Sequence, residues 1–83
     1  MPAVLRADGH RVYFYSHEAN EPPHVHVDRG GASARVWLDG IALLASNAGF
    51  SARELGEVLR LARTRQVQFL EAWHGFFGTD GGP

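Results

Sequence analysis

Two histidines in one short segment are the residues of this chain best suited to chemistry. The segment reads Glu21-Pro22-Pro23-His24-Val25-His26-Val27-Asp28. Side chains two apart in a strand point to the same side, about 6.5 to 7 Å from each other. The imidazoles of His24 and His26 could therefore converge on one metal ion or flank one phosphodiester.

One interpretation is acid–base catalysis without a metal. His24 and His26 would act as acid and base in the cleavage of RNA, and Arg35 would stabilise the charge of the phosphorane. These three are the candidate catalytic residues, and no cofactor is needed. Because two histidines at this spacing are a weakly specific motif, whether the protein is an enzyme stays open.

A second interpretation is a metal-binding module. Two histidines and one carboxylate can bind zinc and leave a position for water. His24, His26 and Asp28 follow one another on the same side of the expected strand. The loop before the strand offers further ligands that could complete the set, namely His17, Glu18 and Glu21. The cofactor would then be a divalent metal such as zinc.

A third interpretation is purely structural. His24 would stack on Trp37 of the next strand, and His26 would lie beside Arg35. Both imidazoles would then fill a half-exposed sheet face or form part of an interface with a partner.

Arginine and aromatic residues are expected on the same sheet face as the histidines. Arg6 directly opposite Arg11 is unfavourable unless an anion lies across the pair. Arginines interleaved with aromatic rings suit single-stranded RNA, which needs phosphate pairing and base stacking. The alternative is that Asp8, Asp28, Asp39 or a helix carboxylate neutralises the arginines. The candidate binding residues are Arg6, Arg11, Tyr13, Tyr15, Glu21 and Trp37.

Two turns must position these faces. Asp8-Gly9 favours a two-residue hairpin turn, because such a turn needs positive φ. It pairs Ala7 with His10, Arg6 with Arg11, Leu5 with Val12, Val4 with Tyr13 and Ala3 with Phe14. Gly30-Gly31 predicts a second hairpin that pairs His24 with Trp37, Val25 with Val36 and His26 with Arg35. In this register the valines point to one side of the sheet and the histidines to the other.

The second half of the chain is expected to be helical. Ser51 and Glu54 form a capping box, which starts a helix. A continuous helix from Ala52 to Phe77 would be about 39 Å long, too long for a domain of this size. It either breaks near Thr64 to Gln66 or packs its second half on another copy, as a homodimer through the C-terminal helix. The segment 41–50 is ambiguous and could hold a short strand over 41–45.

The expected fold class is therefore α+β. A small antiparallel sheet of two hairpins is followed by one long or two short C-terminal α-helices. Residues 1–77 form a single domain, and residues 78–83, which are rich in glycine, form a flexible tail.

Composition narrows the classes of function. The chain has 83 residues, a net charge of −1 and no cysteine, so disulfides, thiolate chemistry and cysteine zinc sites are excluded. Its longest apolar run is five residues, Ile41 to Ala45, which predicts a cytoplasmic protein without a membrane partner. All eight basic residues are arginine, and with so little net charge any nucleic-acid binding must come from a local face.

The sequence resembles a small bacterial family catalogued as domain of unknown function 4160. The Glu-Pro-Pro-His-x-His signature at 21–26 is the most specific part of the likeness. The other similar segments are Val4-Leu5-Arg6, Tyr13-Phe14-Tyr15-Ser16, Trp37-Leu38, Ala45-Ser46-Asn47, Gly49-Phe50-Ser51, Leu70-Glu71-Ala72-Trp73 and Phe77. The resemblance implies a partner, because members are often encoded beside another small protein, as in a toxin–antitoxin module.

We therefore expect a small bacterial interaction protein that resembles a toxin–antitoxin component. It would bind a small protein encoded by a neighbouring gene, with RNA as a further candidate, through the face that carries histidine, arginine and aromatic side chains. The metal-binding module and the metal-independent ribonuclease toxin are the alternatives.

Overall fold

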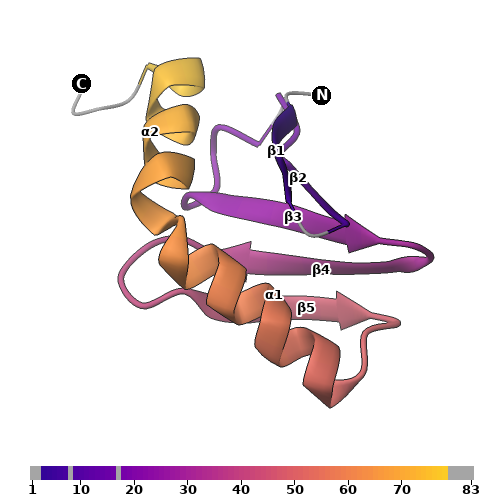
Figure 1. The fold of residues 1–83 in the computed structure, drawn as a ribbon. Helices are drawn as coiled ribbons and strands as arrows, with labels where there is room; N and C mark the ends of the chain where they lie inside the picture. The colour runs from indigo at the N-terminus through magenta and orange to yellow at the C-terminus, as the bar shows by residue number, and fades with distance from the viewer. Residues whose placement is uncertain (1–2, 8, 17, 79–83) are drawn as a thin grey trace.

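The computed structural model describes residues 3–7, 9–16 and 18–78, and contains five strands followed by two helices (Figure 1). The strands are β1 (Ala3–Ala7), β2 (His10–Tyr13), β3 (His24–Arg29), β4 (Ala32–Trp37) and β5 (Leu43–Ala48). The helices are α1 (Ala52–Thr64) and α2 (Gln66–Phe77). The strands form one antiparallel sheet in chain order, β1 to β5. The α+β class is confirmed, whereas the four-stranded sheet is corrected to five strands.

The fifth strand lies where the sequence was ambiguous. It begins at Leu43 rather than Ile41 and continues to Ala48, beyond the expected end at Ala45. Most of its residues are exposed, so it has no apolar alternation that would reveal it. Pairing with β4, interrupted by a bulge, holds it in the sheet.

The second hairpin has the predicted register throughout. His24 pairs with Trp37, Val25 with Val36 and His26 with Arg35. Gly30, at the turn, has a φ of 59°, a conformation that favours glycine. The histidines and valines of β3 therefore point to opposite faces, as predicted.

The first hairpin departs from the prediction beyond its first three pairs. Leu5 pairs with Val12 and Arg6 with Arg11, but a bulge then pairs Ala3 with Tyr13. The expected pairs of Val4 with Tyr13 and Ala3 with Phe14 are wrong. Because the bulge rotates the strand, Val4 packs against the core beside Leu5 instead of lying on the polar face.

The core lies between one face of the sheet and the helices (Figure 1). The sheet contributes Val12, Val25, Val27 and Val36, the residue after β4 contributes Leu38, and the helices contribute Val58, Ala62 and Phe69. Burial of this apolar surface is the main stabilising term, at about 25 cal/mol per Å². The opposite face of the sheet carries the polar side chains of β3, and in Figure 1 neither helix crosses it.

The helical segment breaks at Arg65, so of the two alternatives left open by the sequence the structure has two short helices. At the break, the side-chain amide of Gln66 donates to the carbonyls of Leu38 and Gly40, at 2.7 and 2.6 Å. The guanidinium of Arg63 donates to the carbonyl of Ala42 at 3.1 and 3.2 Å. These bonds hold the β4–β5 loop against the junction of the helices.

The start of α1 also follows the prediction. Ser51 Oγ accepts from the Glu54 amide, and the Ser51 amide donates to the Glu54 carboxylate. Neither helix in the described part of the chain has the length and apolar composition needed to cross a membrane. Of the expected tail over 78–83, Gly78 caps the end of α2 with a φ of 66°, and the remaining residues lie outside the described part of the chain.

Candidate metal centre

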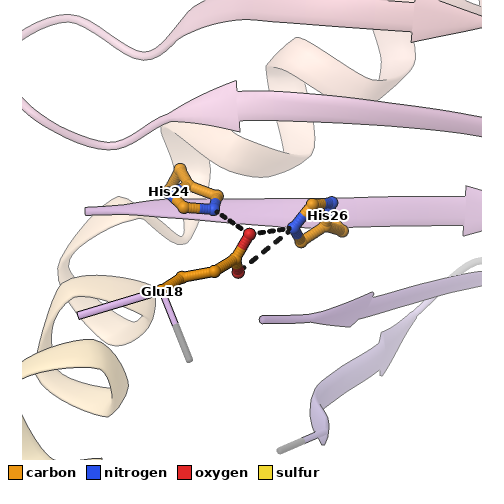
Figure 2. A group of neighbouring side chains, drawn as sticks. All are labelled: Glu18, His24 and His26. Atoms are coloured by element: carbon orange, nitrogen blue, oxygen red, sulfur yellow. Dashed lines mark hydrogen bonds and ion pairs between the residues drawn. The ribbon is translucent and has the colours of Figure 1, made fainter. Parts of the chain in front are cut away.

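The β2–β3 loop folds back over the start of β3 and brings Glu18 to the histidines. Two turns shape the loop: the Glu18 amide donates to the Tyr15 carbonyl at 3.2 Å, and the Glu21 amide donates to the Glu18 carbonyl at 3.1 Å. Figure 2 shows the Glu18 carboxylate between the rings of His24 and His26. The side chain of Glu18 is buried, at 6% exposure.

The three side chains present their ligand atoms to one point. Glu18 Oε2 lies 3.0 Å from His24 Nε2 and 3.1 Å from His26 Nε2. The second carboxylate oxygen, Oε1, lies 3.3 Å from His26 Nε2. One ligand atom from each residue fits within 4.8 Å of the others. We call this group, Glu18 with His24 and His26, the Glu18 cluster.

Backbone groups fix the orientation of the cluster from behind. His24 Nδ1 lies 2.9 Å from the carbonyl oxygen of Pro22. Because a carbonyl only accepts, Nδ1 carries the proton and Nε2 of a neutral ring is left with its lone pair. The Tyr15 amide donates to Glu18 Oε1 at 2.8 Å. Such outer hydrogen bonds are typical of histidine and carboxylate side chains that bind metals.

One ring nitrogen of His24 lacks a hydrogen bond within the described part of the chain. Its side chain is fully buried, yet Nε2 has no hydrogen bond to any residue that the structure describes. The 3.0 Å approach to Glu18 is an ion-pair distance without hydrogen-bond alignment. A lone pair facing a carboxylate is repulsive, so the arrangement requires a cation there, either a proton on His24 or a metal ion.

The electrostatics keep the carboxyl of Glu18 ionised. Burial by itself raises the pKa of Glu18. The hydrogen bond from the Tyr15 amide and then the imidazoles of His26 and His24 lower it by more, so the pKa lies below its ordinary value. An ionised carboxylate is the form that binds a metal.

Aromatic rings enclose the histidines unequally. Tyr13 stacks on His26 with 5.2 Å between ring centroids, and Tyr15 meets the same ring edge-on at 4.9 Å. His24 contacts the ring of Trp73 in α2, at 5.0 Å. The side chain of His26 keeps 15% exposure, whereas His24 has none. Solvent therefore reaches the cluster from the side of His26.

The donor set and its geometry fit a divalent transition metal. Zinc bonds to nitrogen and oxygen are close to 2 Å, which places the ligand atoms of a tetrahedral site about 3.3 Å apart. The separations of 3.0 and 3.1 Å around Glu18 Oε2 are near that value. Three protein ligands would leave at least one position for water or substrate, as in open zinc or non-haem iron sites.

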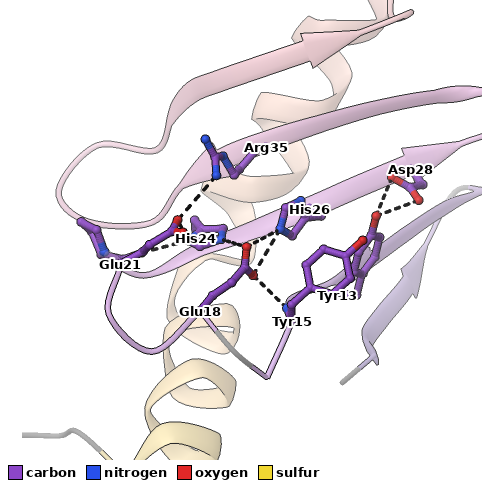
Figure 3. Close-up of polar contacts among 9 residues, drawn as sticks. Tyr13, Tyr15, Glu18, Glu21, His24, His26, Asp28 and Arg35 are labelled. Atoms are coloured by element: carbon purple, nitrogen blue, oxygen red, sulfur yellow. Dashed lines mark hydrogen bonds and ion pairs between the residues drawn. The ribbon is translucent and has the colours of Figure 1, made fainter. Parts of the chain in front are cut away.

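The structure replaces one of the predicted ligands. Asp28 is not part of the cluster, because its carboxylate accepts the Tyr13 hydroxyl at 3.1 and 3.0 Å (Figure 3). Glu18, which the sequence offered only as one of three loop candidates, takes its place. Of the other two, Glu21 lies 3.9 Å from His24 Nδ1 on the far side of the ring, and His17 lies outside the described residues.

The predicted catalytic residues are neighbours, but they are not equally accessible. Arg35 lies opposite His26 in the register and points to Glu21, with 3.5 Å between Nη1 and Oε1 (Figure 3). Its guanidinium also lies over the ring of Trp37, 5.4 Å from the centroid. His24 is fully buried, whereas His26 keeps 15% exposure, so His26 is the imidazole that solvent reaches.

The predicted binding face has a carboxylate beside one of its arginines. Arg6 does pair with Arg11, but Arg11 also lies opposite Asp28 on β3 and over the ring of Tyr13, at 4.8 Å. Tyr13 is only 6% exposed, so it offers little surface for stacking. Tyr15 and Trp37 are half-buried on this face.

A hollow on the other side of the sheet, about 460 Å³ in volume, includes no residue of the Glu18 cluster. A bound ion needs ligands at the right distances rather than a large cavity, so we assign the chemistry to the cluster on its donor atoms.

Comparison with known proteins places the chain in a family. No curated protein and no solved structure matches it. One family model matches residues 9–74, which include the whole Glu18 cluster and most of both helices. The chain therefore belongs to the family described as a domain of unknown function, DUF4160.

Proposed function

We propose that this protein binds one divalent transition-metal ion through Glu18, His24 and His26. The observation that carries the proposal is the buried Nε2 of His24, which faces a carboxylate at 3.0 Å without a hydrogen bond. A metal ion between them would turn this repulsion into two coordinate bonds.

The outer hydrogen bonds favour a metal over an acid–base pair. The Pro22 carbonyl leaves the Nε2 lone pair of His24 toward the cluster, which is the tautomer that a ligand needs. A protonated His24 would instead be a fully buried cation, with Glu18 poorly aligned to its Nε2 and Glu21 at 3.9 Å from its Nδ1. When bound, zinc would act as a Lewis acid and lower the pKa of a coordinated water to about 7. His26, at the accessible side of the cluster, lies opposite Arg35 in the β3–β4 register.

Metal analysis of protein purified without a histidine tag tests this proposal. We expect close to one equivalent of zinc, iron or another divalent transition metal, and a melting temperature that falls when a chelator is added. Full stability in the chelator, together with less than a tenth of an equivalent of metal and no uptake on titration, would overturn it.

A second candidate function is binding to a partner through the open sheet face. Two arginine–aromatic pairs support it, Arg11 over Tyr13 and Arg35 over Trp37. The partner expected from the family resemblance is the small protein of a neighbouring gene, in a cytoplasmic toxin–antitoxin module, and RNA is the other candidate. Co-purification of this neighbour, lost in an Arg11→Ala/Arg35→Ala variant, would support the interaction. Growth that is unaffected when either gene is expressed alone would contradict a toxin.

Self-association through the C-terminal helices has its own support. Val67 and Phe76 in α2 are 70% and 51% exposed, so each presents apolar surface to solvent. Light scattering on the wild type and on Val67→Glu would test it. A wild type that remains monomeric at high concentration would contradict a homodimer.

A further inference from the structure

A second site is suggested by a hollow on the side of the sheet that α1 covers. Its volume of about 460 Å³ is within the range of small-molecule sites. One wall is a stripe of α1 with spacings of three and four residues: Glu57, Arg60, Leu61 and Thr64. The other wall comes from His10 at the start of β2 and Arg29 at the end of β3. Arg65, between the two helices, closes one end.

The hollow carries positive charge in a chain whose net charge is −1. Three guanidinium groups line it against one carboxylate, that of Glu57. Arg29 Nη1 lies 3.4 Å from Glu57 Oε1, but both side chains are about half exposed, so their attraction is weak. Glu54, one turn earlier on α1, is engaged by the backbone of Ser51 in the capping box.

Two of the arginines have donors left for a ligand. The side chain of Arg60 has no ion pair or hydrogen bond with any of the described residues, and it is exposed. Arg65 donates through Nη1 to the side-chain oxygen of Gln68, which leaves most of its five N–H groups. The guanidinium groups of Arg60 and Arg65 therefore keep N–H donors for a ligand.

These groups match the chemistry of a phosphate ester. A guanidinium presents two parallel N–H donors that fit two phosphate oxygens. The hydroxyl of Thr64 can donate to the same group, and half-buried Leu61 offers an apolar contact to the remainder of the ligand. We propose that this hollow binds a phosphate-bearing ligand of nucleotide size, through Arg29, Arg60 and Arg65, independently of the Glu18 cluster.

Binding of ATP, observed by NMR on ¹⁵N-labelled protein, tests the proposal. A Glu18→Gln variant in the presence of a chelator serves as the background, so that no phosphate can bind through a metal. We expect ATP to shift the amide signals of residues 57–65 and of Arg29, and adenosine, which has no phosphate, to shift them far less. Arg60→Ala should weaken ATP binding at least tenfold.

Arg53→Ala is the matched control. It removes the same charge from an exposed position of the same helix, outside the hollow, and alanine favours helix at both positions. Equal weakening by the two variants, or no binding at millimolar ATP, would overturn the proposal. Binding of a single-stranded RNA ten nucleotides long is measured in the same way. If it bound far more tightly than ATP and with the same dependence on Arg60, a nucleotide-sized ligand would be ruled out in favour of a nucleic-acid backbone.

Discussion

Two polar groups lie side by side on the open face of the sheet, and they differ in how far their hydrogen bonds are satisfied (Figure 3). In the first, the Tyr13 hydroxyl donates to both oxygens of Asp28 at 3.1 and 3.0 Å. The second is the Glu18 cluster, where the buried Nε2 of His24 has no hydrogen bond among the described residues. The ring of Tyr13, stacked on His26, joins the two groups.

The difference separates a structural contact from a candidate binding site. A donor and an acceptor that match, as in Tyr13 and Asp28, stabilise the fold and need nothing further. In the Glu18 cluster, His26 Nε2 can donate to the carboxylate, but a neutral His24 presents a lone pair to it, so a cation is needed at that point. Burial of a group that is incomplete in this way is destabilising unless a ligand completes it.

The largest expected effect is on metal binding when a ligand of the Glu18 cluster is replaced. Glu18→Gln and His24→Gln keep the approximate shape of each side chain but remove a ligand atom or change its charge. We expect each to lower metal affinity by at least about 100-fold, more than the loss of an outer hydrogen bond would. Titration with zinc in competition with a chelating dye measures the change. Affinity within threefold of the wild type would place the metal elsewhere.

Substitutions in the Tyr13–Asp28 pair should lower stability and leave metal affinity nearly unchanged. Tyr13→Phe removes the donor from Asp28 and should lower the free energy of unfolding by about 1 to 3 kcal/mol, because a part-buried carboxylate loses its partner. Metal affinity should stay within threefold, and Asp28→Asn should likewise leave it unchanged. Urea unfolding and the dye titration measure the two quantities. Loss of metal from Asp28→Asn would restore that residue as a ligand.

High pH should act on the Tyr13–Asp28 pair. Burial, followed by the hydrogen bond to Asp28, raises the pKa of the Tyr13 hydroxyl far above its ordinary value of 10.0. Above pH 10 the unfolded chain therefore loses this proton while the folded chain keeps it, so stability falls as the pH rises. The fall should be smaller in Tyr13→Phe, as measured by urea unfolding at pH 9, 10 and 11. Parallel curves for the two proteins would contradict the assignment.

The smallest effect is expected far from both groups, at the start of α1. Ser51→Ala removes the side-chain half of the capping box and should lower the free energy of unfolding by about 1 kcal/mol. It should leave metal affinity unchanged, so it controls for indirect effects of stability on binding. A large loss of metal in this variant would show that the dye titration reports folding rather than ligation.

Sequence reasoning succeeded where the pattern is local. Glycines at 30 and 31 and alternating valines determined the register of β3 and β4, and with it the shared face of His24 and His26. The excess length of a single helix indicated either a break near Thr64 to Gln66 or packing on another copy. The structure has the break, where Gln66 donates to the β4–β5 loop.

What the sequence could not determine depends on contacts between distant residues. The exposed strand β5 exists through its pairing with β4, and the β1 bulge shifts the end of a register that the turn alone cannot specify. Glu18 reaches the histidines because the loop folds back on itself, whereas Asp28, in line with them, is held by Tyr13 from the neighbouring strand. An acidic loop residue just before a His-x-His strand was the available signal, and it did not distinguish Glu18 from Glu21.

Coordination of cobalt(II) would test the central proposal most directly. Absorption and X-ray absorption spectra of the cobalt-loaded protein would report the number and type of ligands. We predict one ion held by two imidazole nitrogens and a carboxylate oxygen, with at least one water, and one imidazole fewer in His26→Gln. An ion surrounded only by oxygen, or a spectrum unchanged in His26→Gln, would contradict the metal centre.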